Sequence, residues 1–214
     1  MRRCRIHARK TTTKGSPDQL GKAKQVIESQ LIPAAGSLPG FKGAYWLADP
    51  ETGAGLAFTF YDTKQSLEDS AQAATKLRGD TTQQIGADVV SVEEYEVVAD
   101  TGQKVHNDAS HVRVAQFEFG PAKIEDGISM LRQFVLPNAQ KLPGFVGGFW
   151  LADRASGKGV GVTLFDSKEN VVATREQANK IRTEGASRIG APIAEFKEYE
   201  VLTRAETPAG ATAR

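Results

Sequence analysis

Apolar and polar residues alternate in two stretches of the chain, residues 4–13 and, more clearly, residues 110–119. Alternation with a period of two predicts a strand in each stretch. A small residue and a proline follow each strand, the pair that typically begins a helix. Apolar residues at helical spacing come next: Leu20, Ala23, Ile27 and Leu31 after the first strand, and Ile124, Ile128, Leu131 and Val135 after the second.

The same order of elements continues in both stretches. A Pro-Gly turn leads into a second strand, a glycine-containing hairpin joins it to a third, and a helix of about 20 residues and a last strand follow. The residues that mark these steps are Pro39-Gly40 and Pro143-Gly144 at the turns, Asp62 and Asp166 as the expected helix N-caps, Gly86 and Gly190 at the helix ends, and 88–98 and 192–203 as the last strands. The predicted order is β-α-β-β-α-β, twice, as in ferredoxin-like domains.

The two stretches are copies of one another. Trp46-Leu47-Ala48-Asp49 returns as Trp150-Leu151-Ala152-Asp153, 104 positions later (150 − 46), and the other matches share this offset without a gap. A repeat of this length indicates a duplicated domain, because solenoid repeats are roughly 20–50 residues long. We therefore predict a first domain over 1–98, a linker over 99–109, a second domain over 110–203 and a disordered tail over 204–214.

Strand composition predicts how the copies associate. In the second strand of the second copy, both alternating sets of residues between 145 and 152 are apolar. A sheet with helices on one side only would show a polar outer face. The other face should therefore be covered by the sheet of the other copy. The expected fold class is α+β, with two ferredoxin-like βαββαβ domains packed sheet to sheet as an intramolecular dimeric α/β barrel. One chain would then form a pseudo-dimer, and further homo-oligomerisation of such chains stays open.

Composition excludes several kinds of partner. The formal net charge of +1 gives no field that would favour nucleic acid or a membrane surface. Cys4 is the only cysteine, so an internal disulfide and a cysteine-based zinc site are excluded, and we expect no metal. Neither a signal peptide nor an apolar stretch of about 18 residues is present, so we expect a cytoplasmic protein.

The chain resembles the dimeric α/β-barrel superfamily, and within it the antibiotic-biosynthesis-monooxygenase-like (ABM) domains. Pro-Gly-Phe opening the second strand carries the resemblance, together with the passage from third strand to helix at Phe60-Tyr61-Asp62 and Leu164-Phe165-Asp166. The resemblance covers nearly all of both copies. It implies a fused dimer with a pocket between sheet and helices in each copy, and activities that include cofactor-independent oxygenation of polyphenols and haem degradation.

Haem degradation is disfavoured. Haem-degrading relatives use a histidine on the second helix, an asparagine on the first strand and a tryptophan near the start of that helix. Here the histidines are His7, His106 and His111, and Tyr61 and Phe165 stand at the tryptophan position. We expect no resident cofactor.

Oxygenation without a cofactor needs an acid or base, a cation for the substrate anion and an aromatic wall. His7 and Arg9 share a strand face, and His111 and Arg113 repeat the pair. Tyr45 and Tyr61 supply hydroxyls in the first copy only. We take His7, Arg9, Tyr45 and Tyr61 as candidate catalytic residues, and Trp46, Trp150, His111 and Arg113 as candidate substrate-binding residues. A catalytic site would need these side chains to meet at a pocket of about 300 Å³ or more.

Each candidate has a structural alternative. The His and Arg residues could lie at an exposed edge or pair with helix carboxylates, each Trp could be core, and the Tyr hydroxyls could reach solvent. Arg78 and Arg182 are expected to meet helix-end carbonyls. Two functions stay open: a cofactor-independent monooxygenase acting on a small hydroxylated aromatic, and a non-catalytic ligand-binding or stress-response barrel.

Overall fold

The computed structural model describes residues 5–102, 108–190 and 192–206. Cys4, the middle of the predicted linker and the predicted tail from residue 207 lie outside them. The chain forms two compact units. The first unit comprises the residues up to Glu96 and those from Glu200 onward, and the second unit comprises Val97–Tyr199.

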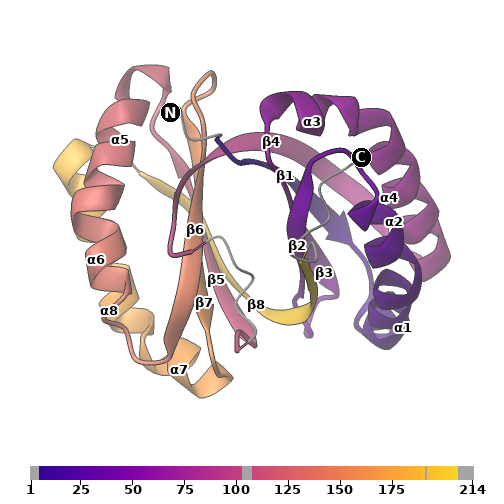
Figure 1. Ribbon diagram of the computed structural model, residues 1–214. Helices are drawn as coiled ribbons and strands as arrows, with labels where there is room; N and C mark the ends of the chain where they lie inside the picture. The colour runs from indigo at the N-terminus through magenta and orange to yellow at the C-terminus, as the bar shows by residue number, and fades with distance from the viewer. Residues whose placement is uncertain (1–4, 103–107, 191, 207–214) are drawn as a thin grey trace. The chain divides into compact units, whose positions relative to one another are not determined.

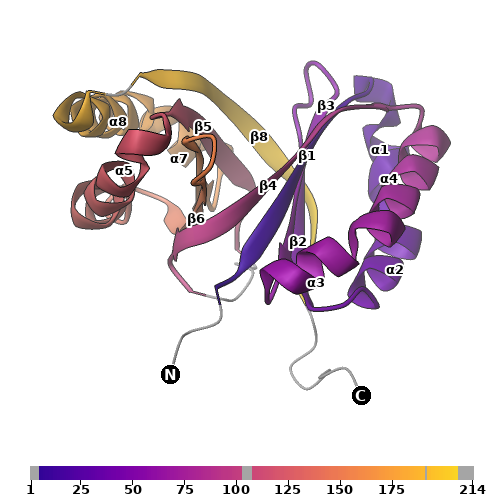
Figure 2. The same cartoon turned by 90° about the horizontal axis from the view of Figure 1, so that it is seen from above.

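In the first unit, helices cover one face of an antiparallel sheet, with α1 and α4 in contact along it (Figures 1 and 2). The strand order is β4-β1-β3-β2-β8. Its elements are β1 (His7–Lys14), α1 (Leu20–Val26), α2 (Ile32–Gly36), β2 (Phe41–Ala48), β3 (Ala54–Tyr61), α3 (Lys64–Asp69), α4 (Ala71–Ile85) and the larger part of β4 (Asp88–Asp100).

The second unit repeats this arrangement with the strand order β8-β5-β7-β6-β4. Its elements are β5 (His111–Glu118), α5 (Ile124–Met130), α6 (Leu136–Ala139), β6 (Phe145–Asp153), β7 (Lys158–Phe165), α7 (Lys168–Ala173), α8 (Arg175–Ile189) and the first part of β8 (Ile193–Glu206). Register is the same in both units: His7 pairs with Tyr61 in the first, and His111 pairs with Phe165 in the second.

Two strands belong to both units. β4 leaves the first unit after Glu96, and β8 enters it at Glu200. The hydrogen-bonded strand order is consequently closed, β1-β3-β2-β8-β5-β7-β6-β4. The predicted α+β class, a dimeric α/β barrel within one chain, is confirmed. The compact units differ from the predicted domain boundaries because β4 continues to Asp100 and the residues of β8 from Glu200 pair with β2.

Proline shapes the first helix of each unit. A π-helical turn, Ile27–Leu31, stands between α1 and α2, and Pro33 lies in the first turn of α2. A proline inside a helix lacks an N–H and clashes with the preceding turn, and a π turn accommodates that local change. The second unit has the same π-helical turn at Leu131–Val135, before Pro137.

The predicted second helix is two helices. α3 ends and α4 begins at Ser70, and Thr174 holds the same position between α7 and α8. The N-cap prediction was wrong by one residue. Thr63 Oγ1 accepts the Ser66 N–H of α3 at 3.0 Å, and Ser167 Oγ caps α7 by accepting the Asn170 N–H.

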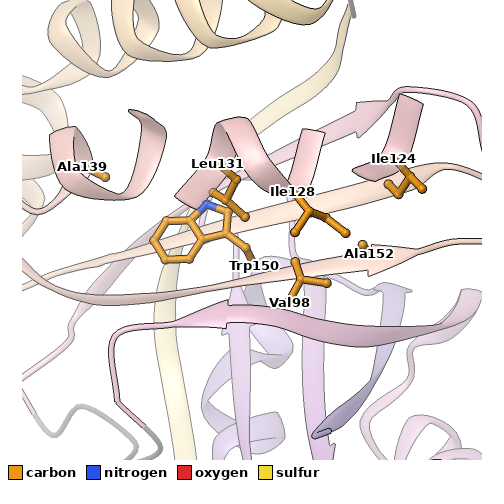
Figure 3. Close-up of a cluster of buried hydrophobic side chains, with 7 residues drawn as sticks. All are labelled: Val98, Ile124, Ile128, Leu131, Ala139, Trp150 and Ala152. Carbon is orange, nitrogen blue, oxygen red and sulfur yellow. The ribbon is translucent and has the colours of Figure 1, made fainter. Parts of the chain in front are cut away.

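The helix-facing core of the second unit surrounds Trp150 (Figure 3). Its indole lies beneath Leu131, and Val98 of β4 packs in the same cluster. The equivalent cluster of the first unit contains Ile27, Ala44 and Trp46. Among the described residues, no helix is both long enough and apolar enough to cross a membrane.

Candidate functional site

The first unit contains a cavity of ≈ 130 Å³ between its sheet and its helices. β1, β2 and β3 form its floor, and α1, α2 and α4 form its roof. Its apolar lining includes Ile27, Leu31, Ala35, Leu38, Trp46, Ala57, Leu77 and Leu202. Its polar lining includes Arg9, Thr11, Thr13, Thr59, Tyr61 and Arg78.

Polar groups line the whole length of the cavity, since Thr11 and Thr13 pair with Ala57 and Gly55, but Arg9 and Tyr61 meet at one end of the strands. Trp46 pairs with Ala57 on β3, four residues before Tyr61. At about 3.3 Å per residue, these positions lie roughly 13 Å apart. We call the end beside Tyr61 and Arg9 the polar end of the cavity, and Trp46 lies toward the other end, which also contains Thr11 and Thr13.

Arg9 organises the polar end. Its side chain is 3% exposed, and Nη1 donates to the Tyr61 hydroxyl at 3.2 Å. Nε and Nη2 donate to one carboxylate oxygen of Glu94 at 3.1 and 2.9 Å. A buried guanidinium is costly unless it is paired and its N–H groups are satisfied, and Arg9 meets both conditions.

The remaining Arg9 contacts hold the break between α3 and α4. Nη2 donates to the Leu67 carbonyl at 2.8 Å, and Nη1 donates to Ser70 Oγ at 3.3 Å. Leu67 O and Ser70 are where the two helices meet, so a strand residue fixes the angle between them. Arg9 therefore has a structural function as well as lining the cavity.

Arg113 repeats these contacts in the second unit. It donates to the Val171 carbonyl, to Thr174 Oγ1 at 3.3 Å and to Glu198 at 3.1 Å. Burial lowers the pKa of Arg113, and the hydrogen bond to Glu198 opposes that effect. Recurrence of the His-x-Arg pattern thus reflects a shared helix-break contact.

Arg78 is the second guanidinium at the cavity. It lies on α4, half-buried, and Nη2 donates to the Thr75 hydroxyl at 3.1 Å. Within the described part of the chain it forms no ion pair, whereas Arg9 has Glu94. Burial lowers the pKa of Arg78, and the nearby positive charge of Arg9 lowers it further. The expected contact with helix-end carbonyls is replaced by a contact with a neutral hydroxyl.

The corresponding space in the second unit is ≈ 40 Å³. Phe117 and Phe119 stand where the first unit has Thr13 and Gly15, and their rings are stacked with centroids 5.6 Å apart. Both rings line what remains of the space. The two units share a fold, but of the two equivalent spaces between sheet and helices that of the first unit is about three times larger.

Two glycines make room for these rings. A Cβ on Gly127 would come within 2.9 Å of the Phe119 ring, and one on Gly161 would come within 3.0 Å of Trp150 and 3.4 Å of Phe117. The first unit has Ala23 and Ala57 at the same positions. Compared with the first unit, the second unit thus has larger side chains at two positions and glycine in place of alanine at the two positions that contact them.

Arg182, the counterpart of Arg78, lies over the ring of Phe196 with its guanidinium carbon 3.9 Å from the centroid. Burial lowers its pKa to about 10, and Arg113 adds to the effect. The first unit has Val92 at the position of Phe196, and within the described residues Arg78 has no cation–π contact. Arg78 instead faces the cavity.

The predicted catalytic residues divide into two sets. Arg9 and Tyr61 meet at the cavity, whereas His7 and Tyr45 are outside its lining. Tyr45 is buried, but it alternates with Trp46 on β2 and so faces the other side of the sheet. His7 lies half-buried beyond Arg9, where burial lowers its pKa and Glu96 opposes that effect. The volume is also below the expected 300 Å³.

Among the predicted substrate-binding residues, Trp46 lines the larger cavity. Trp150 lines the smaller space, and Arg113 forms the helix-break contact. His111 lies beside Ser110, whose hydroxyl is 2.9 Å from Nδ1. His111 and Arg113 are outside both linings.

No metal site emerges in the ranges that the structure describes, where no three His, Cys, Asp or Glu side chains come together. The lining of the larger cavity is likewise composed of hydroxyl, guanidinium, amide and apolar groups. These groups suit an organic ligand with an oxygen atom better than a metal ion, which prefers imidazole, thiolate or carboxylate.

No family model matches the chain. Two uncharacterised proteins of Mycobacterium tuberculosis (strain ATCC 25618 / H37Rv) are similar to it. One is 24% identical over 196 residues, covering 92% of this chain and 87% of the relative. The other is 22% identical over 197 residues, covering 92% and 83%.

Solved structures show the same fold. An anthrone oxidase-like protein matches with a TM-score of 0.70 and 16% identity, covering 99% of this chain and 97% of that one. A ferredoxin-fold protein from Listeria monocytogenes 4b F2365, related to antibiotic biosynthesis monooxygenases, matches with a TM-score of 0.52 and 12% identity, covering 91% and 94%. The resemblance to ABM-like dimeric α/β barrels is confirmed at the level of the fold.

Proposed function

We propose that this ABM-like protein binds a small hydroxylated aromatic molecule in the cavity of its first unit and oxygenates it without a cofactor. One observation carries the proposal: of the two related sites, only the first combines open space with an indole wall, a tyrosine hydroxyl and an arginine without an ion pair. The similarity in fold to an anthrone oxidase-like protein supports the same class of chemistry.

The reaction requires an electron-rich anion, because ground-state O₂ accepts electrons singly. A phenolate with an activated C–H group passes one electron to O₂, and the resulting radical and superoxide join through a new C–O bond. The peroxide then takes up a proton and loses water, and the C–H hydrogen leaves as a proton. One oxygen atom ends as a carbonyl and the other as water, so the substrate supplies all the electrons.

The cavity residues have separate functions in this scheme. Arg78 stabilises the phenolate, since a cation in a site of low polarity favours the ionised form. Tyr61, held by Arg9 at 3.2 Å, presents its own hydroxyl proton to the anion or to the peroxide. Trp46 and the aliphatic residues exclude water from the radical pair.

A non-catalytic ligand-binding protein is the second candidate. The observation that favours it is the absence of an imidazole or carboxylate among the described residues that line the cavity. An enzyme with this lining would depend on substrate that ionises in the field of Arg78. Its rate would then follow the pKa of the substrate rather than that of a histidine.

Oxygen uptake by purified, metal-free protein tests the proposal. The panel contains hydroquinones, catechols and anthrones, with free haem as a separate sample. We expect uptake with at least one phenol, loss of about ten-fold or more in Tyr61→Phe and Arg78→Met, and unchanged uptake in Arg182→Met, the matched variant of the second unit. No uptake with any phenol would favour the binding protein.

A further inference from the structure

The cavity of the first unit also limits the size and charge of its ligand. This step rests on the proposed function only for the location of the site. Its volume is ≈ 130 Å³, and an apolar protein cavity of about 150 Å³ holds one benzene molecule. One aromatic ring with a small substituent fits this volume, whereas two or three fused rings exceed it.

The charge balance of the polar end points to an anion. Glu94 lies 2.9 Å from Arg9 and compensates that guanidinium. Within the described residues, Arg78 forms a hydrogen bond to the Thr75 hydroxyl and no ion pair, and Glu94, already paired with Arg9, attracts it only weakly. The cavity thus carries one excess positive charge beside a hydroxyl donor.

The residues that could neutralise Arg78 from within the protein are engaged elsewhere. Glu96 contacts Arg5 at 3.2 Å, and Glu93 contacts Lys10 at 2.6 Å. Lys10 alternates with Arg9 on β1, so its ion pair lies on the other face of the sheet. Glu94 itself accepts two N–H groups from Arg9.

The second unit shows the same arginine without a ligand site. Arg182 stacks on Phe196 at 3.9 Å, and Phe117 and Phe119 occupy the space that a ligand would take. Phe196 gives this guanidinium a cation–π contact and Nη2 donates to Asn179 Oδ1 at 2.9 Å, although Nε and Nη1 are buried without a hydrogen-bond partner among the described residues. In the first unit, Val92 replaces Phe196 and the space beside Arg78 is open to a ligand.

We infer that the ligand of the first unit is a single-ring aromatic monoanion, with its anionic oxygen at Arg78 and its ring between Trp46 and the α1 side chains. A carboxylate and a phenolate share this chemistry. Arg78 is accordingly a specificity-determining residue that selects charge, and Thr13 and Gly15 permit entry of one ring.

Isothermal titration calorimetry with the full chain tests the expected size and the expected charge of the ligand. The probes are benzoate and a nitrophenolate as one-ring anions, benzamide as the neutral analogue, acetate as an anion without a ring, and 9-anthracenecarboxylate as a three-ring anion. We expect at least one of the two one-ring anions to bind, and to bind about ten-fold or more tightly than benzamide, because hydrogen bonds to charged groups are the stronger ones. Acetate and the three-ring anion should not bind measurably.

Two matched variants distinguish a loss of the binding site from a general effect on the fold. Arg78→Met should weaken the binding of the one-ring anion about ten-fold or more, whereas Arg182→Met should leave it unchanged. Equal affinity for benzamide, equal affinity for the three-ring anion, unchanged binding in Arg78→Met, or no binding of either one-ring anion would each overturn the inference.

The outcomes also separate this inference from the proposed function. One-ring anions that bind without any phenol being oxygenated would leave the inference intact and remove the enzymatic proposal. Oxygen uptake with an anthrone, which has three fused rings, would support the enzymatic proposal and overturn the size limit.

Discussion

The ring of Phe119 occupies the space beside Gly127 in the second unit, where a Cβ at residue 127 would lie 2.9 Å from the nearest ring carbon. Gly127→Ala should therefore fail to deliver the gain of about 1 kcal/mol that replacing a helical glycine normally brings. Overpacking costs about 1–3 kcal/mol, so we expect net destabilisation of roughly 1 kcal/mol in urea unfolding.

Gly79→Ala is the matched control, because Gly79 lies within α4 with open space around its Cβ position. It should stabilise the protein by about 0.5–1 kcal/mol. In a Phe119→Ala background, Gly127→Ala should recover the same gain. A stabilising Gly127→Ala in the parent protein would mean that the ring moves aside at no cost.

Exchanging cavity residues between the units should fill the cavity of the first unit and enlarge the space of the second. Thr13→Phe places in the first unit the ring that closes the second, and we expect ligand binding there to fall about ten-fold or more. The reciprocal Phe117→Thr enlarges the space of the second unit and should cost about 2 kcal/mol through the cavity it leaves. Calorimetric titration and urea unfolding measure the two effects, and undiminished binding in Thr13→Phe would place the ligand elsewhere.

Loss of the helix-break contact should be costly in both units. Arg9→Met removes both donors to Glu94 and one of the two side-chain donors to the Leu67 carbonyl, which keeps Ser70 Oγ, and we expect a loss of about 3 kcal/mol in the free energy of unfolding. Arg113→Met should behave alike, although Arg113 is outside the lining of either cavity. A difference of more than about 2 kcal/mol between the two would show that the contacts are not equivalent.

Helix caps give a prediction that distinguishes neighbouring residues. Thr63→Ala and Ser167→Ala should each cost about 1 kcal/mol, because each removes the acceptor for an N–H of α3 or α7. Asp62→Ala should cost less than Thr63→Ala in the same thermal unfolding experiment. The reverse order would restore Asp62 as the cap.

Acid should destabilise the protein partly through His7. Burial lowers its pKa below the ordinary 6.5, with Lys64 and Arg5 acting in the same direction and Glu96 and Glu68 against it. The unfolded chain then binds the proton more readily, so stability present above pH 6.5 is lost as the pH falls through the folded pKa. The difference in unfolding free energy between about pH 7.5 and 5.5 should be smaller in His7→Gln than in the parent. Identical differences would show that His7 does not contribute.

The order of elements could be predicted because each signal occurs twice. The Pro-Gly turns and the helix-ending glycines stand at equal offsets, and both Gly86 and Gly190 adopt the left-handed conformation that ends a helix. The break at Ser70 had no such signal, since neither glycine nor proline marks it. It depends on Arg9, which is 61 residues away in sequence.

The site was predicted in part. Tyr61 and Trp46 were identified from residue type, but the importance of Arg78 depends on what lies around it, which no local pattern encodes. Comparison of the two copies could have revealed more: Thr13 against Phe117 and Gly15 against Phe119 are the largest changes of side-chain volume on the first strand and the residue after it. Such differences between duplicated domains indicate where one copy has been filled.

Glu200–Glu206 of β8 complete the first unit beside β2. The ribosome therefore synthesises the two segments of the cavity-bearing unit at different times, separated by the whole of the second unit. The last strand of the first unit emerges more than 100 residues after Glu96, a delay of roughly 5–20 s at ordinary rates of translation. During that interval the edge of β2 is without its final partner. Nascent chains should therefore acquire ligand binding only when synthesis has passed Glu206, long after every cavity residue except Leu202 has been made.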